Sequence, residues 1–200
     1  MELRLVGSEM CIRDRSSDSN KAKIISSYIS KISSNTKIII PDLNNNFQKA
    51  ISQIELLIKN NDKPISFIGS SLGGYFAAYF ADIYNAKAIL VNPAIPPLRG
   101  FDDYLGENKN YSTGEKFNIK KEDIKFLRGL SIKEYINKEN TLILMESGDE
   151  VLPYKETSEY FKGCYIDIVF GGNHSYESMQ TKLKKISYFF CSCLRDFEIC

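Results

Sequence analysis

Residues 64–85, PISFIGSSLGGYFAAYFADIYN, decide the fold of this chain. Residues 65–68 form a short apolar run that predicts a β-strand, and residues 72–84 predict a helix. Between them lies GSSLG, residues 69–73, which fits the pattern G-x-S-x-G in its required setting of strand, sharp turn and helix. A serine on such a turn has a strained backbone, and glycines two positions away leave room for it. Ser71 is therefore the candidate nucleophile.

A glycine-rich turn between a strand and a helix can instead bind a phosphate group. The chain contains neither G-x-G-x-x-G nor G-K-[ST], and this favours the nucleophile. The predicted helix also carries small residues at helical spacing, which allow a helix to lie close to a sheet. These residues are Gly74, Ala77, Ala78 and Ala81.

The charge and hydropathy of the chain exclude several classes of protein. A net charge of +1, from 26 basic and 25 acidic residues, gives no reason to expect binding to nucleic acid or to a charged membrane surface. No apolar run approaches the length of a membrane span, so we expect a soluble protein. A chain of 200 residues is long enough to bury a sizeable core.

The cysteines indicate a reducing, cytoplasmic environment. They are Cys11, Cys164, Cys191, Cys193 and Cys200. Their number is odd, they are scattered, and no secretory signal precedes them. A single Cys-x-Cys lacks a second pair of ligands, so we expect neither a metal nor another cofactor.

The composition of residues 1–15 differs from that of the remaining chain. Lys, Asn and Ile are abundant later, whereas residues 5–15, LVGSEMCIRDR, contain no Lys and no Asn. This string resembles the translation of a sequencing adapter, and we interpret residues 1–15 as a non-native segment. A divergent but genuine N-terminus is the alternative. Residues 16–200 are then expected to form a single domain.

From residue 16 onward, predicted helices and strands alternate. Apolar periodicity predicts helices over about 21–33, 47–58, 72–84, 120–130 and 154–161 and from Tyr176, and strands over 37–40, 65–68, 86–91, 141–145 and 165–170. This alternation predicts an α/β fold: a three-layer α/β/α sandwich whose mostly parallel sheet is covered by helices on both faces.

Residues 93–131 interrupt the alternation. Three prolines are followed by a polar, tyrosine-rich stretch without clear periodicity. A segment of this length inside a compact domain is often a lid or a substrate-facing loop, and solvated surface is the equal alternative.

A serine nucleophile needs a base and an acid that orients the base. The only histidine, His174, follows the last predicted strand, on the rim where sites in parallel sheets form. The acid is expected after the preceding strand, where Asp149 is the first choice. Glu150 is the rival, and Glu146 is a lesser one because it ends a strand. Asp167, inside the edge strand, is expected to be solvated.

The order Ser71, Asp149, His174 is the chain order of α/β-hydrolases. Five segments resemble, in order, motifs of the small bacterial α/β-hydrolase esterases of the YqiA and YcfP type: FIGSSLGGYFAAYFAD, AILVNPAIPP, DDYLGENKNYSTGE, LILMESGDEVLPY and GGNHSYES. The resemblance covers residue 16 to the C-terminus. It implies a compact α/β-hydrolase core, these three residues as the catalytic triad, and activity on ester or thioester bonds of acyl substrates.

The sequence departs from these esterases at the oxyanion hole. One donor is expected to be the backbone N–H of Leu72, and the second comes from a His-Gly-Phe-like loop after the first strand. That loop would fall at residues 11–13, inside the segment interpreted as non-native. The lost strand would be central, and residues 2–6 or 9–12 are expected to replace it poorly.

The sequence thus predicts a serine esterase that hydrolyses a small acyl ester or thioester through an acyl-enzyme. Leu98, Phe101, Tyr104 and Tyr111 are the candidates for lining an acyl pocket, from their place in the insert. An acyltransferase with the same triad, or a non-catalytic binding protein of this fold, is the alternative.

Overall fold

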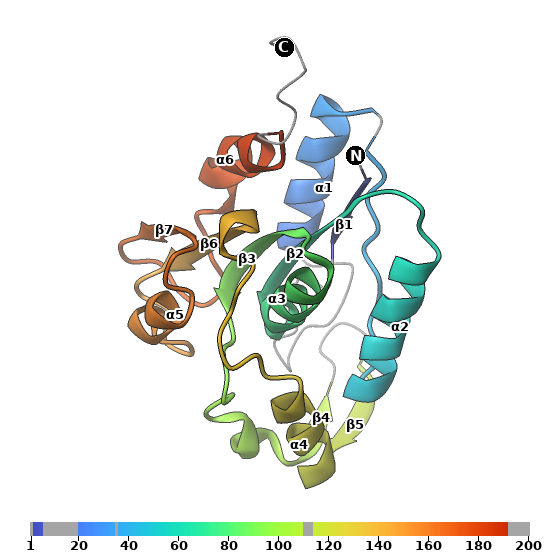
Figure 1. Ribbon diagram of the computed structural model, residues 1–200. Coiled ribbons are helices and arrows are strands. Elements are labelled where there is room, and N and C mark those ends of the chain that lie inside the picture. Colours follow the sequence, from blue (N-terminus) through green and yellow to red (C-terminus); the bar gives the residue numbers. More distant parts are fainter. Residues whose placement is uncertain (1, 6–19, 35, 110–113, 192–200) are drawn as a thin grey trace.

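A parallel β-sheet runs through the centre of the protein (Figure 1). The computed structural model describes residues 2–5, 20–34, 36–109 and 114–191. In this part of the chain the spatial order of the strands is β1 (Glu2–Leu5), β2 (Ile65–Ser71), β3 (Lys87–Pro93), β6 (Thr141–Glu146) and β7 (Tyr165–Val169). Every neighbouring pair is parallel, so the carboxyl ends of all these strands lie at one edge of the sheet.

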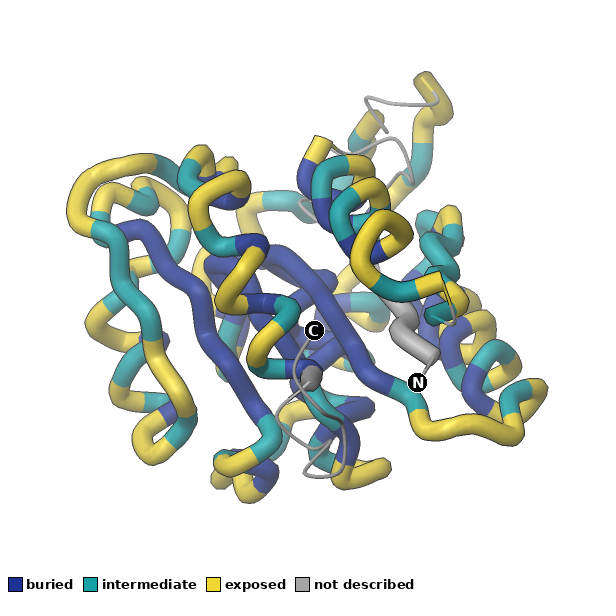
Figure 2. Tube along the Cα trace, turned by 90° about the horizontal axis from the view of Figure 1, so that it is seen from above, coloured by how far each residue is buried: buried dark blue, intermediate teal, exposed yellow. Residues whose placement is uncertain are grey.

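Helices cover both faces of this sheet, which confirms the predicted three-layer α/β fold. The helices are α1 (Asn20–Ile32), α2 (Phe47–Lys59), α3 (Leu72–Tyr84), α4 (Lys121–Gly129), α5 (Tyr154–Tyr160) and α6 (Met179–Cys191). Side chains of β3 alternate between the two faces: Ile89 and Val91 pack with α1 and α6, whereas Leu90 packs with α2 and α3. Figure 2 shows the resulting buried strands between helices whose outer sides are exposed.

β1 occupies the position beside β2. Glu2–Leu5 pairs in parallel register with residues 65–68. The sequence predicted a central strand at this place and a poor replacement for it by residues 2–6 or 9–12. Residues 2–5 do form a strand there, but β1 is the outermost strand of the described sheet and pairs with β2 alone. Residues 6–15, the rest of the segment interpreted as non-native, lie outside the described residues.

The predicted strand at residues 37–40 is wrong as a regular strand. Of these residues only Ile39 has a β-bridge in the described structure. Pro41 follows directly and offers no backbone N–H, which limits extension of a ladder in this direction. The isoleucines favour an extended backbone, but a strand also needs a continuous partner.

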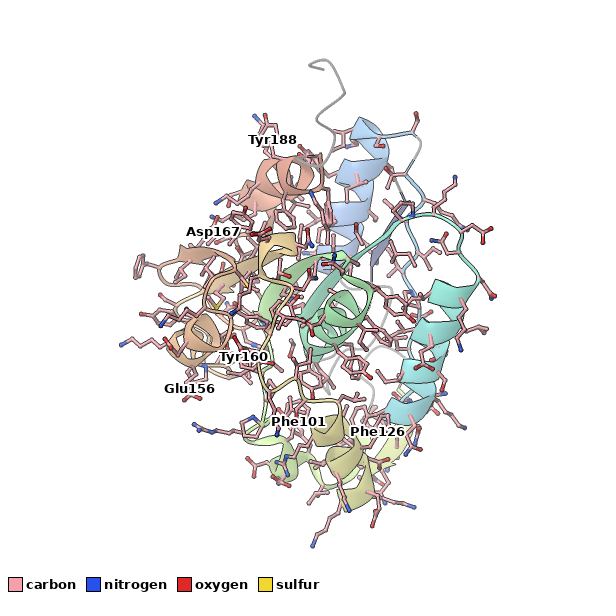
Figure 3. All side chains as sticks on the ribbon, viewed as in Figure 1. Phe101, Phe126, Glu156, Tyr160, Asp167 and Tyr188 are labelled. Carbon is pink, nitrogen blue, oxygen red and sulfur yellow. The ribbon has the colours of Figure 1, made fainter. Side chains whose placement is uncertain are left out.

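The insert after β3 is more ordered than its sequence indicated. Helix α4 lies where the sequence predicted a helix over 120–130. The unexpected elements are the 3₁₀ helix η1 (Phe101–Tyr104) and an antiparallel pair made of β4 (Gly106–Lys109) and β5 (Lys116–Ile119). The buried Tyr75 hydroxyl of α3 donates a hydrogen bond to the carbonyl of Leu127, at 2.7 Å. Figure 3 labels Phe101 of η1 and Phe126 of α4 on the same side of the molecule. The insert is therefore packed onto the domain rather than solvated throughout.

Two expectations near the C-terminus are corrected. Helix α6 begins at Met179 rather than at Tyr176, whose φ of 55° is not helical. Asp167 is not solvated: its side chain is 9% exposed and pairs with Lys182 and Lys185 of α6. Burial opposes ionisation of this carboxyl, but the hydrogen bonds from the two lysines hold its pKa below the ordinary value.

A short 3₁₀ helix, η2 (Lys138–Asn140), precedes β6. Within the described ranges, no helix combines the length and the apolar character needed to cross a membrane.

Candidate active site

Ser71 lies at the junction of β2 and α3 and has a strained backbone conformation. Its φ is 54° and its ψ is −125°, outside the regions that L-residues favour. A Cβ on Gly69 would lie 2.1 Å from the carbonyl oxygen of Gly73, and one on Gly74 would lie 2.8 Å from Cβ of Pro93. The glycines therefore allow the turn to close and α3 to approach β3.

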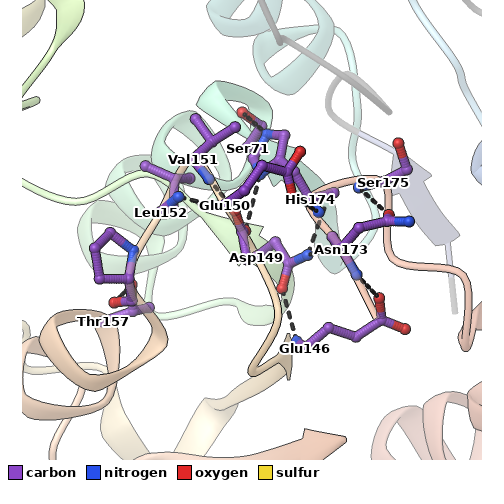
Figure 4. Close-up of polar contacts among 12 residues, drawn as sticks. Ser71, Glu146, Asp149, Glu150, Val151, Leu152, Thr157, Asn173, His174 and Ser175 are labelled. Carbon is purple, nitrogen blue, oxygen red and sulfur yellow. Dashed lines mark hydrogen bonds and ion pairs between the residues drawn. The ribbon is translucent and has the colours of Figure 1, made fainter. Parts of the chain in front are cut away.

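The structure brings the three sequence-predicted residues together at the carboxyl edge of the sheet (Figure 4). His174 Nε2 lies 3.1 Å from Ser71 Oγ, and His174 Nδ1 lies 2.8 Å from Asp149 Oδ2. The His174 side chain is 11% exposed and that of Asp149 is 1% exposed. A serine, an imidazole and a carboxylate thus form one chain of contacts with little access to water.

Asp149 is oriented by its own loop. Its Oδ1 accepts hydrogen bonds from the backbone N–H groups of Val151 and Leu152, both at 2.8 Å. Its Oδ2 is left to face Nδ1 of His174. A carboxylate at Nδ1 favours the tautomer that carries the proton there, so that Nε2 is free to accept the proton of a serine hydroxyl.

Neither rival acid contacts the imidazole ring through a hydrogen bond. Glu150 Oε2 accepts a hydrogen bond from the backbone N–H of His174 at 3.0 Å. Glu146, 0% exposed, accepts hydrogen bonds from the backbone N–H groups of Asn173 and Ser178 instead, both at 2.8 Å. Burial opposes ionisation of Glu146, but these hydrogen bonds hold its pKa below the ordinary value. Both carboxylates hold the loop of His174, not its ring.

Sequence reasoning missed the role of Asn92, the sixth residue of β3. Its side chain is buried and donates hydrogen bonds to the carbonyl oxygens of Asn173 and His174, both at 3.1 Å. A polar residue directly after the apolar run of a buried strand was the available signal. Its partners, more than 80 positions away, were not readable from the sequence.

A cavity of about 220 Å³ opens beside Ser71 and His174. Phe101 and Tyr104 of the insert line it, as predicted, together with Val151 and Leu152. Leu98 does not line this cavity; it lines a neighbouring one of about 270 Å³ that shares several walls with the first. Tyr111 lies outside the described residues.

Leu72 is the first residue of α3 and is fully buried. The first N–H groups of a helix have no intrahelical acceptor, so this group is available to a developing negative charge. Residues 11–13, the expected source of a second donor, lie outside the described residues. In the ranges that the structure describes, no cluster of three His, Cys, Asp or Glu side chains could hold a metal ion.

Comparisons with known proteins give one family and one fold. The sequence model of "Uncharacterised protein family (UPF0227)" matches residues 14–191. Alpha/beta hydrolase domain-containing protein 10 from mouse is similar in structure, with a TM-score of 0.74, 14% identity, and coverage of 96% of this chain and 90% of that protein. Est1E from Butyrivibrio proteoclasticus has a TM-score of 0.67 at 16% identity, with 96% and 87% covered.

The esterase domain of a Rhodothermus marinus protein is similar as well, with a TM-score of 0.66, 15% identity, and coverage of 97% and 86%. Identities this low show a shared fold and no more. The chain therefore has the α/β-hydrolase fold.

Proposed function

This chain belongs to the uncharacterised protein family UPF0227, and from its fold and the geometry around Ser71 we propose that it is a serine hydrolase that cleaves small acyl esters or thioesters. The observation that carries the proposal is the contact chain from Ser71 Oγ through His174 to Asp149, with distances of 3.1 and 2.8 Å. One protein of similar fold, from Rhodothermus marinus, is described as an esterase domain, which agrees with an ester substrate.

In the proposed mechanism, Ser71 Oγ attacks the carbonyl carbon of the substrate while its proton passes to His174 Nε2. The carbonyl oxygen becomes an oxyanion, and the backbone N–H of Leu72 donates a hydrogen bond to it. Asp149 stabilises the imidazolium through Nδ1. The tetrahedral intermediate then collapses: the bond to the alcohol or thiol breaks, and this leaving group takes the proton from Nε2.

The acyl group is now an ester of Ser71. A water molecule loses a proton to His174 Nε2 and attacks the same carbonyl carbon. Collapse of the second intermediate returns the proton to Ser71 Oγ and releases the carboxylic acid. No metal or cofactor takes part in this sequence of steps.

The cavity beside Ser71 supports a small acyl or alcohol group as the bound part of the substrate. Aromatic and aliphatic side chains line it, and Arg99 and Asp103 are the charged residues among the lining groups that do not belong to the candidate triad. Apolar walls with few polar groups are typical of pockets that bind small organic molecules.

The test is hydrolysis of p-nitrophenyl acetate and butyrate by the purified chain, beside Ser71→Ala. We expect saturable hydrolysis that Ser71→Ala abolishes, because removal of the nucleophile removes the acyl-enzyme route. A fluorophosphonate probe should label Ser71 and no other serine, as read by mass spectrometry of the digested protein. A folded wild-type chain that neither turns over the esters nor reacts with the probe would instead support a non-catalytic binding protein.

A further inference from the structure

The loop that carries His174 lies outside helices and strands, and several of its residues have positive φ angles. Gly171, Gly172 and Tyr176 have φ values of 89°, 71° and 55°, and the helix starts only at Met179. Within the loop, the N–H groups of Tyr176 and Ser175 donate to the carbonyl and to Oδ1 of Asn173, at 3.1 and 2.9 Å. These short-range bonds form a turn, and contacts from other elements fix where that turn lies. These contacts come largely from two buried polar side chains at the ends of β3 and β6.

Glu146, the last residue of β6, binds the N–H side of the loop. Its Oε2 accepts hydrogen bonds from the backbone N–H groups of Asn173 at 2.8 Å and Glu177 at 3.2 Å, and its Oε1 from that of Ser178 at 2.8 Å. A Cβ on Gly172 would lie 2.0 Å from Oε2. The loop thus wraps around one fully buried carboxylate, and a glycine permits the close approach.

Asn92, near the end of β3, binds the carbonyl side of the same loop. Its Nδ2 donates to the carbonyl oxygens of Asn173 and His174, both at 3.1 Å, and its Oδ1 accepts from the backbone N–H of Glu146 at 3.0 Å. The amide therefore joins the end of β6 to the histidine. Its φ of 39° is one that Asn tolerates better than most residues.

We propose that Glu146 and Asn92 are positioning residues, which hold the His174 imidazole in register with Ser71 and Asp149. Neither side chain lines the cavity beside Ser71, so neither is expected to touch the substrate. They act on the main chain of His174 and its neighbours, and a displacement of the ring by 1 Å is enough to lower turnover on the order of 100-fold. The expected change in kcat rests on the proposed function, whereas the expected change in the position of the His174 ring does not.

The chain contains a comparable pair near the amino ends of β3 and β6, made of Asp82 of α3 and Asn137 before η2. Asp82 Oδ1 accepts hydrogen bonds from the backbone N–H groups of Ile136 and Asn137, both at 3.0 Å. Asn137 Nδ2 donates to the carbonyl oxygens of Ala81 at 2.9 Å and Ala86 at 2.7 Å. As with Glu146 and Asn92, a carboxylate accepts from backbone N–H groups and an amide donates to backbone carbonyls. Asp82 is half-buried and accepts two N–H groups rather than three, and none of these bonds involves a candidate active-site residue.

His174 is the only histidine of the 200 residues, so its ring can be observed alone in protein labelled with ¹⁵N-histidine. In the wild type we expect the resonances of a single, ordered ring with a proton on Nδ1, because Asp149 Oδ2 lies 2.8 Å from that atom. Glu146→Gln should broaden these resonances or move them toward those of free histidine, because one amide cannot replace a carboxylate that accepts three N–H groups. Asp82→Asn should leave them unchanged.

Kinetics supply the second readout, with p-nitrophenyl butyrate as the substrate. Glu146→Gln should lower kcat on the order of 100-fold with KM within about threefold. In a His174→Ala background the same change should have no further effect on the residual rate, since a positioning residue acts through the ring. Asp82→Asn should change neither constant.

The proposal is overturned if folded Glu146→Gln keeps the wild-type ring spectrum, if Asp82→Asn disturbs the ring equally, or if the loss persists undiminished in the His174→Ala background. Should Glu146→Gln not fold, the same comparison is made with Asn92→Asp and Asn137→Asp. Failure of Glu146→Gln and Asn92→Asp to fold while Asp82→Asn and Asn137→Asp fold would also overturn it, because Glu146 and Asn92 would then be a requirement of the fold. A wild type without ester hydrolysis refutes the proposed function and leaves the ring spectra as the decisive test of positioning.

Discussion

A buried asparagine and a carboxylate lie near each end of the neighbouring strands β3 and β6, and the two places differ in what these groups hold. At the carboxyl end both residues belong to the strands, whereas near the amino end Asp82 is part of α3 and Asn137 precedes η2. At the amino end, Asn137 and Asp82 fasten the connection between α3 and β3 to the segment before β6. At the carboxyl end, Asn92 and Glu146 fasten the loop of His174. Similar hydrogen bonds therefore serve a packed connection in one place and a candidate base in the other.

The difference lies in the backbone that is held. The carbonyl of Ala81 belongs to α3 and that of Ala86 to the residue just before β3, so regular structure already constrains both. Residues 171–178 lie between β7 and α6 and belong to neither, and their conformation depends in large part on the side chains that bind them. A buried hydrogen bond at the amino end thus contributes mainly to stability, whereas one at the carboxyl end also fixes the geometry of the site.

The largest effect on kcat is expected from Asp149→Asn, at the carboxyl edge of the sheet. The asparagine amide at Nδ1 would favour the wrong imidazole tautomer, and kcat should fall about 10⁴-fold with little change in stability. Glu150→Gln, which alters only the partner of the His174 backbone N–H, should lower kcat less than tenfold. Initial rates with p-nitrophenyl butyrate measure both. Equal losses would show that Asp149 is not the orienting acid.

The next largest effect is expected from a comparison of two glycines, Gly172 and Gly163, each replaced by alanine. In Gly172→Ala a Cβ would lie 2.0 Å from Glu146 Oε2 at a φ of 71°, so we expect a loss of about 2–4 kcal/mol in the free energy of unfolding, with reduced kcat. Gly163 also has a positive φ, of 94°, but its added Cβ would meet only the flexible Lys138 side chain at 3.1 Å. Gly163→Ala should therefore cost about 1–2 kcal/mol and leave kcat unchanged. Urea unfolding with activity per folded molecule separates the two, and a normal kcat in Gly172→Ala would contradict the comparison.

The pH dependence of the free energy of unfolding should reveal how much the ionised Glu146 carboxylate contributes to stability. The folded-state pKa of Glu146 lies below the ordinary value, so its ionisation contributes stability that is present above the unfolded pKa of about 4.3 and lost as pH falls through the folded pKa. In Glu146→Gln the free energy of unfolding should fall less steeply between pH 5 and the acid limit of the measurement. Asp167 contributes with the same sign in both proteins and cancels. Equal slopes in urea titrations across this range would refute the prediction.

The smallest effect is expected at the amino end, from Tyr135→Phe. The buried Tyr135 hydroxyl lies 2.6 Å from Thr141 Oγ1, which also donates to the carbonyl of Asn137. Loss of one neutral hydrogen bond should lower the free energy of unfolding by about 1 kcal/mol. Because this contact holds no part of the site, kcat should be unchanged; a fall in kcat would show that the amino end also controls the site.

Much of the fold could be predicted because its signals are local. The strand, turn and helix around Ser71 follow from residues next to one another, and the chain order of Ser71, Asp149 and His174 assigned the three candidates before their positions were known. The match to UPF0227 confirms the family resemblance that the motifs indicated. The triad assignment remains a prediction, which the variants above test.

The remaining features depend on contacts between distant segments. Glu146 could be read only as a weak rival acid, because its three N–H donors lie 27 to 32 positions away. The pairing of β4 with β5 was hidden by a polar, tyrosine-rich sequence that carries no strong alternation. At residues 37–40 the opposite occurred, since local β-propensity was present without a continuous partner.

The two buried asparagines also lie near the points where the insert meets the rest of the domain. The insert begins after Pro93, next to Asn92, and the chain returns to the central sheet through Asn137 and η2, so a hydrogen-bonded asparagine lies near each junction. A change of sequence within the insert would alter the part of the cavity wall that Phe101 and Tyr104 form, whereas Ser71, Asp149 and His174 lie outside it. Under the proposed function, substrate preference and the reaction itself therefore depend on different segments of the chain, and one can change without the other.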